Sequence, residues 1–170
     1  MRRDPVIHDE HQTGDMANVA ELIWSIRIAL LTTADPEGHF HTRPVETLQI
    51  ERGADIWFFT GWSSPKVDEL LRDRRVSLGY ADPGRRVYLA VGGWAGLLRD
   101  PTKARELWTE EQRAYYPNGP GDERLALLRV RIERAEYWIA PRRATYRIAA
   151  ATAAATGKPA DVVGENHRIR

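Results

Sequence analysis

Residues 55–71 constrain the fold most strongly, because they place a buried strand directly before a helix start. The run Ile56–Phe59 is aromatic and β-branched, which favours a pleated and largely buried strand. Ser64 and Pro65 are typical of a helix N-terminus, since Ser caps free amides and Pro at the first helical position loses no hydrogen bond. The apolar face of this helix is predicted at Val67, Leu70 and Leu71.

Ser64 and Lys66 also bring a hydroxyl and an ammonium group to this helix start. Free N–H groups and the helix dipole attract anions at such a position, so a phosphate-bearing ligand is expected to fit there. The alternative is an ordinary capped helix, which is the commoner meaning of Ser-Pro-Lys. The neighbouring strand with Arg43 favours the anion site.

The composition indicates a globular chain of 170 residues, 42% hydrophobic and 29% charged, which fits one domain or one domain with a tail. The net charge of +1 gives no global field for nucleic acid or an anionic membrane, so neither is expected as a partner. The absence of cysteine excludes disulfides, thiolate metal sites and cysteine nucleophiles. The longest apolar stretch, residues 22–31, is interrupted and too short to span a bilayer, so a cytoplasmic location is the default expectation.

Residues 1–14 are polar and are predicted to form a loose N-terminal arm. His8 and His11 within it have a spacing that could bind a metal, but no third ligand is nearby, which favours a frayed terminus. Asp15 is expected to cap a helix from Met16 to about Ser25.

Six strands are expected next, joined by turns rich in Pro and Gly: residues 28–33, 39–50, 55–60, 75–80, 86–98 and 125–139. The fifth is interrupted by Gly92 and Gly93, which suggest a bulge. Asp100 and Pro101 begin another helix, and residues 144–156 are Ala-rich and predicted to be helical, before a polar tail. This order predicts a mainly β (α+β) chain folded as a small closed β-barrel with flanking helices.

Arg43 lies in the second strand, where alternation places it on the same face as Val45 and Thr47. Pro44 cannot donate to a ladder, so it belongs at an edge or at a bulge that lines a ligand. The Arg43 guanidinium suits bidentate recognition of phosphate or carboxylate. With Ser64 and Lys66 it would complete an anion cradle; the alternative is a surface Arg.

His39 and His41 share one face of the same strand. They could serve as a proton donor or as metal ligands, but solvated hairpin histidines are the preferred interpretation. No catalytic residue and no metal site is assigned from the sequence.

The order of these segments resembles the pyridoxamine 5′-phosphate oxidase-like FMN-binding split barrel, within which the chain is most similar to the general stress protein 26 type. The similarity runs from about residue 15 to the C-terminus. The matching stretches are residues 28–35 with Gly38, 41–44, 56–60 with 63–66, 76–80, 93–95, 99–100, 108–117, 135–138, 157–158 and 164–166.

The resemblance implies a six-stranded antiparallel split β-barrel at residues 15–143 and a homodimer with two FMN sites at the subunit interface, FAD being possible. The strand that begins at Arg43 would line the flavin and its phosphate. The cofactor-binding residues that it implies are Arg43, Pro44, Val45, Glu46, Phe59, Thr60, Ser64, Lys66, Tyr88 and Trp138.

The chain departs from the family pattern at two places. Pro65 replaces a phosphate-binding Arg, which leaves more of that role to Ser64 and Lys66. The Arg-x-His segment that grips pyridoxal phosphate in the oxidases is missing after Trp138, which argues against a pyridoxamine 5′-phosphate oxidase. The leading expectation is an FMN-binding stress-type protein with oxidoreductase activity on an unknown acceptor, and the alternative is a non-catalytic flavin-binding or storage protein.

Overall fold

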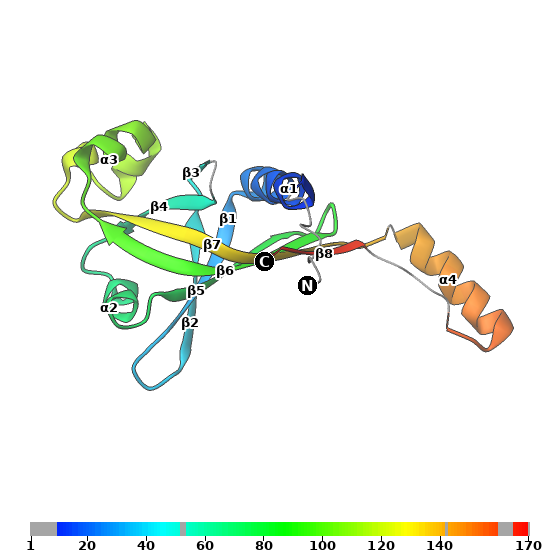
Figure 1. Ribbon diagram of the computed structural model, residues 1–170. Coiled ribbons are helices and arrows are strands. Elements are labelled where there is room, and N and C mark those ends of the chain that lie inside the picture. The colour runs from blue at the N-terminus through cyan, green and yellow to red at the C-terminus, as the bar shows by residue number, and fades with distance from the viewer. Residues whose placement is uncertain (1–9, 52–53, 142, 160–164, 170) are drawn as a thin grey trace, which may run out of the picture.

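The computed structural model describes residues 10–51, 54–141, 143–159 and 165–169 (Figure 1). Its strands are β1 (Ile28–Ala34), β2 (Phe40–Glu46), β3 (Gln49–Glu51), β4 (Asp55–Gly61), β5 (Arg75–Asp82), β6 (Val87–Leu98), β7 (Leu125–Ile139) and β8 (Glu165–Ile169). Its α-helices are α1 (Glu10–Ile26), α2 (Pro65–Arg72), α3 (Pro101–Leu107) and α4 (Arg143–Thr156), and the 3₁₀ segments are η1 (Glu110–Ala114) and η2 (Gly119–Gly121). In the described ranges, no helix is long and apolar enough to cross a membrane.

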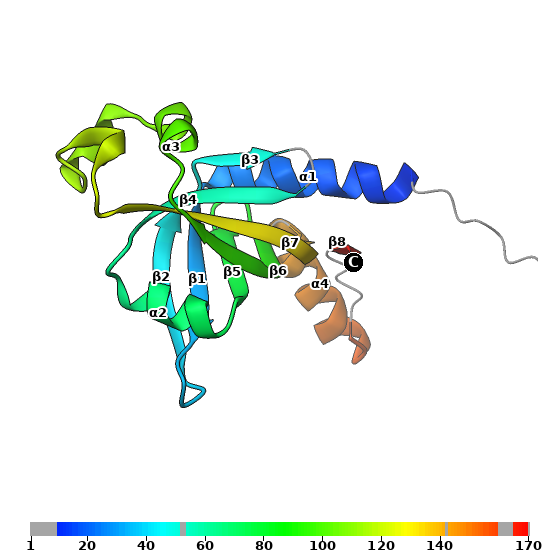
Figure 2. The same cartoon turned by 60° about the vertical axis from the view of Figure 1, so that its left-hand side comes forward.

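The strands form one antiparallel sheet in the order β2-β1-β5-β6-β7-β4-β3, with β8 paired to β7. Figure 2 shows this sheet curling from β2 through β5 and β6 to β7 and β4. Although β2 and β4 are far apart in the hydrogen-bonded order, they approach each other in space. The barrel is therefore split along a seam between β2 and β4.

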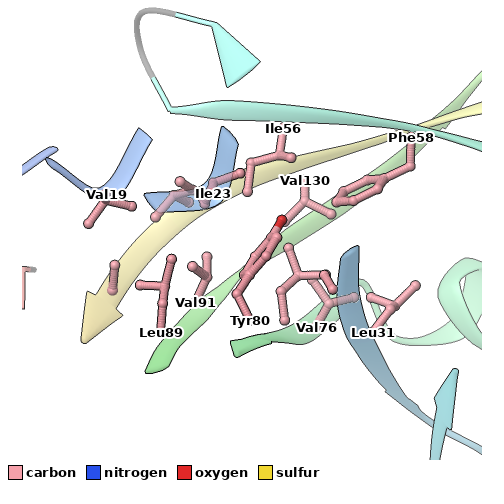
Figure 3. Packing of buried hydrophobic residues seen from close by; sticks show 14 of the residues in the cluster. Val19, Ile23, Leu31, Ile56, Phe58, Val76, Tyr80, Leu89, Val91 and Val130 are labelled. Atoms are coloured by element: carbon pink, nitrogen blue, oxygen red, sulfur yellow. The ribbon is translucent and has the colours of Figure 1, made fainter. Parts of the chain in front are cut away.

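The core fills the inside of this curled sheet. Strands such as β1 and β5 alternate buried and exposed residues, which is the period of a sheet with one buried face. Leu31, Phe58 and Tyr80 meet there, and Val19 and Ile23 of α1 close the cluster with no exposed surface (Figure 3). Each such side chain contributes roughly 1.5–3 kcal/mol on burial.

The predicted fold class is confirmed, and five of the six expected strands are present close to their expected bounds. The bulge predicted at Gly92 and Gly93 is also confirmed, because the β6–β7 register shifts between these two residues. A Cβ on Gly93 would lie 2.2 Å from the Arg131 carbonyl oxygen, so the strands can approach this closely only without a side chain there.

The prediction of one continuous strand over residues 39–50 was wrong. The chain leaves the ladder with β1 at Glu46 and begins pairing with β4 at Gln49. Thr47 between them is fully buried, its N–H donates to the Arg27 carbonyl oxygen at 2.8 Å, and its hydroxyl lies 2.9 Å from the Tyr80 hydroxyl. Arg27 and Tyr80 thus supply hydrogen-bond partners for the buried polar groups of Thr47, which the alternation of the strand does not predict.

The two ends of the chain also differ from the prediction. α1 begins at Glu10, so the loose arm predicted for residues 1–14 does not extend that far, and Asp15 lies inside the helix. His8 lies outside the described residues. The polar tail contains β8, which the sequence pattern did not indicate because pairing with β7, and not apolar alternation, makes it a strand. The Ala-rich helix is confirmed as α4, which projects away from the barrel in Figure 1.

A buried carboxylate joins β1, β2 and α2. Glu69 is only 6% exposed, whereas Leu71, expected on the apolar face of α2, is 63% exposed. Glu69 Oε2 accepts from the Thr33 hydroxyl and, at 2.9 Å, from Arg43 Nη2, while Oε1 accepts from His41 Nδ1 at 2.6 Å. Burial raises the pKa of Glu69, but these hydrogen bonds outweigh burial and hold it below its usual value. Val67 and Leu70 are buried as predicted.

The Gly93 approach gives a matched test of stability. We expect Gly93→Ala to lower the free energy of unfolding by about 1–3 kcal/mol or more, because the new methyl group would overlap backbone atoms. Gly79→Ala is the control, since its Cβ meets no atom within 4 Å. Thermal and urea unfolding of both variants measure the difference; equal losses would contradict a steric need for Gly93.

The Glu69 network predicts a pH-dependent stability. At neutral pH, Glu69→Gln should cost about 1.5–3 kcal/mol, because Arg43 and His41 lose a charged acceptor. Since the folded-state pKa is depressed, this contribution is present above the unfolded value of about 4.3 and is lost as the pH falls through the folded value.

Urea unfolding of wild type and Glu69→Gln from neutral to acidic pH should therefore show two converging curves. Asp68→Asn, on the exposed side of α2, is the control and should cost at most about 1 kcal/mol through the helix dipole. A gap for Glu69→Gln that stays constant down to strongly acidic pH would contradict the network.

Candidate flavin groove

A groove of about 640 Å³ runs along the seam between β2 and β4. This volume lies in the range of roughly 300–1,000 Å³ that small-molecule sites occupy. Three walls enclose it, from β2, from β4 with the start of α2, and from the segment around η1. The lining residues are Ile28, Arg43, Pro44, Val45, Glu46, Leu48, Phe59, Thr60, Gly61, Lys66, Glu111, Gln112, Ala114, Tyr115 and Tyr116.

The groove brings together most of the residues predicted from the sequence. Seven of the ten line it directly, namely Arg43, Pro44, Val45, Glu46, Phe59, Thr60 and Lys66. Ser64 is held beside them by hydrogen bonds to Lys66 and Thr60. The seam explains this gathering, because it brings the edge strand β2 close to β4 and the helix that follows it.

One end of the groove is cationic. Lys66 Nζ donates to the Thr60 hydroxyl at 3.0 Å and to the Ser64 hydroxyl at 3.1 Å. Burial lowers the pKa of Lys66, the nearby Arg43 lowers it further, and Glu69 opposes them. The positive charge of Lys66, partly buried and next to the N-terminus of α2, favours an anionic group on the ligand.

Ser64 occupies the N-cap of α2, but its hydroxyl makes no capping hydrogen bond. The expected side-chain cap was therefore wrong, and the hydroxyl instead lies 3.1 Å from Lys66 Nζ and 3.3 Å from the Thr60 hydroxyl. Pro65 at the first helical position has no N–H. The local chemistry thus offers a ligand two hydroxyls and an ammonium group together.

Arg43 lines the groove, but its guanidinium is also part of the Glu69 network. Nη2 donates to Glu69, and Nη1 donates to the Thr33 hydroxyl and, at 2.9 Å, to the His41 carbonyl oxygen. The guanidinium is thus engaged by groups of this chain, and only Nη2 donates to a carboxylate, so the predicted bidentate contact is not formed with Glu69. Arg43 adds positive charge to the groove, whereas Lys66 donates to neutral hydroxyls.

Aromatic residues also line the groove. Phe59 packs against Trp108 with ring centroids 6.1 Å apart and edge-on against Tyr116 at 6.4 Å. The residues predicted from the sequence did not include Tyr115, Tyr116 and Glu111, which also line the groove. The available signal was the Tyr-Tyr pair itself, since large aromatic side chains on a loop often contact ligands.

Tyr88 and Trp138 are not among the lining residues. They face each other in the β6–β7 ladder and are 41% and 36% exposed. The alternation of both strands directs these side chains to the outside of the barrel. The structure therefore places the two together but apart from the groove.

The histidines of the β1–β2 hairpin contact carboxylates. His39 Nδ1 lies 3.1 Å from Asp35 Oδ2, and His41 joins Glu69. The ligand atoms of Asp35, Glu37 and His39 also lie within 4.8 Å of one another. Hydrogen bonds and the turn geometry account for this arrangement.

Known proteins share the fold and part of the sequence. A Clostridium acetobutylicum protein related to general stress protein 26 of B. subtilis superposes with a TM-score of 0.67 over 92% of this chain and 96% of its own, at 19% identity. The general stress FMN/FAD binding protein of Xanthomonas citri is 29% identical, with a TM-score of 0.63 over 78% of this chain and 90% of its own. Protein bli-3 of Neurospora crassa is 25% identical over 156 residues, which are 85% of this chain and 75% of that protein.

The first of these likenesses supports the split-barrel fold alone, because its identity is low. The family model described as pyridoxamine 5′-phosphate oxidase like matches residues 14–161, which include every strand from β1 to β7 and the whole groove. Fold, seam and sequence agree, and the chain belongs to the pyridoxamine 5′-phosphate oxidase-like family.

Proposed function

We propose that the chain binds FMN in the seam groove and acts as a flavoprotein of the general stress protein 26 type. The observation that carries this proposal is the lining of the groove, which combines a partly buried ammonium group and two hydroxyls with aromatic side chains. A phosphorylated ligand with a large planar ring matches that combination of groups. The description of the Xanthomonas citri relative as FMN/FAD binding supports it, and also allows FAD.

The residues present fit FMN in size and chemistry. Lys66, Thr60 and Ser64 would hold the phosphate, and Arg43 would add positive charge behind them. Pro44, Val45 and Glu46 of the edge strand β2, together with Phe59, would line the ring. A bound flavin supplies hydride and electron transfer, while the protein supplies binding, orientation and electrostatics.

A second copy of the chain is part of the proposal. Tyr88 and Trp138 point outwards from the barrel, so they would reach a flavin only in another subunit. The outer face between them and the groove carries small residues at Gly79 and Ala90 and an exposed Leu30. Exposed apolar side chains around a flat patch are typical of a self-association surface. These features support a homodimer with flavin at the interface as part of the proposal.

We include reductase activity on an acceptor still to be identified, because flavin is itself the redox-active group. The missing Arg-x-His segment argues against oxidation of pyridoxamine phosphate. The cytoplasmic location stays a prediction from the sequence.

Titration of FMN and riboflavin tests the phosphate end. Wild type should bind FMN more tightly than riboflavin. Lys66→Ala should weaken FMN by about 1.5–3 kcal/mol, roughly 10- to 150-fold, because a charged donor to the phosphate is lost, and should leave riboflavin unchanged.

Lys158→Ala is the charge-matched control, since Lys158 is exposed and lies outside the groove. Flavin fluorescence quenching gives both dissociation constants. A wild-type chain that is colourless and takes up no FMN would refute the proposed function.

Anaerobic mixing of the FMN-loaded protein with NADH or NADPH tests turnover. We expect the visible flavin absorbance to bleach and to return when an acceptor such as a quinone is added. Flavin that stays oxidised would assign the chain to the alternative role of holding flavin without turnover. Hydrogen peroxide formation with pyridoxamine phosphate would instead support the oxidase.

A further inference from the structure

Tyr115 is a large aromatic residue at the groove that stays open to solvent. Tyr115 is one of the residues that line the groove, and it is 76% exposed. Exposing a large aromatic ring to water leaves apolar surface that burial would favour by about 25 cal/mol per Å². The ring therefore has surface to gain from a ligand in the groove.

The backbone under Tyr115 is held in place. The Gln112 side chain accepts from the Thr109 N–H at 2.8 Å and from the Thr109 hydroxyl at 2.6 Å, forming a capping box. The N–H groups of Tyr115 and Tyr116 both donate to the Gln112 carbonyl oxygen, at 3.0 and 2.9 Å. Gln112 itself is buried. These hydrogen bonds hold the backbone of Tyr115 in place at the groove.

Tyr116 and Gln112 account for how this segment packs on the barrel. Tyr116 lies edge-on to Phe59, and burial raises the pKa of its hydroxyl. Tyr115 makes no ring contact of this kind within the described residues. Packing within the chain therefore does not explain a tyrosine at position 115. Its place on the groove wall indicates a role in ligand binding.

We propose that Tyr115 is a ring-binding residue, whose phenol packs on the isoalloxazine of the flavin across the groove from β2. This inference rests on the proposed function and adds the third wall of the site. Lys66 lines the groove on the α2 wall and Tyr115 on the η1 wall, so the phosphate and the ring of one ligand are held by different elements. Offset or edge-on contact between aromatic rings contributes beyond the area that it buries.

The test separates the two ends of the ligand. Tyr115→Ala should weaken FMN and riboflavin by the same factor, roughly 2- to 12-fold, because both carry the ring. It should also raise the fluorescence of the bound flavin, since a phenol in contact with the ring quenches emission. Tyr115→Phe should keep the affinity. Tyr146→Ala, which removes a half-exposed tyrosine from α4, is the matched control and should change neither quantity.

The outcomes are distinguishable. If wild type binds no FMN, the proposed function fails, and the role of Tyr115 with it. If wild type binds FMN but Tyr115→Ala retains both affinities and the emission, the inference fails while the function stands. A loss for FMN alone would place Tyr115 at the phosphate and overturn the ring assignment. A shift from dimer to monomer in size-exclusion chromatography would make it a subunit contact, which also overturns it.

Discussion

The carboxylate of Glu69 is the constraint on which the site depends. It is buried at the point where α2 crosses β1 and β2, and a buried charge is tolerated only where it is paired and hydrogen-bonded. Thr33, His41 and Arg43 supply those bonds, so the helix cannot shift without leaving a charge unsatisfied. Because α2 carries Lys66 at its start, the same network fixes the cationic end of the groove.

The split in the barrel forms the groove that Lys66 lines. A fully closed barrel fills its interior with side chains, whereas a seam between β2 and β4 leaves space lined by two neighbouring strands. The chain connecting β6 to β7 covers the seam with η1, which brings Tyr115 and Tyr116 opposite β2. The groups that we propose to bind the phosphate and the ring thus come from segments about fifty residues apart in sequence, held by one sheet.

Sequence reasoning reached the strands and the helix start of residues 55–71 because local chemistry specifies them. Alternation, aromatic runs and Ser-Pro are read from a few neighbouring residues. It placed Lys66, Thr60 and Arg43 in one site through the order of segments shared with the family. It missed Glu69, because a charged residue is expected on the solvated side of an amphipathic helix. It misread Leu71, because an apolar residue at helical spacing is expected on the buried side. The buried Thr47 turn and the paired strand β8 were missed because their bonds come from distant strands.

The sequence by itself determined a mainly antiparallel barrel, a helix start rich in hydroxyls beside a lysine, and a chain without cysteine chemistry. These follow from local pattern and composition, which need no knowledge of distant contacts. Only the tertiary structure decided that Arg43 donates to Glu69, that Ser64 turns to Lys66 and leaves its helix uncapped, and that Tyr115 stands over the groove. Each of these depends on which groups the folded chain brings together, because a side chain with several possible partners bonds to the one within hydrogen-bond distance.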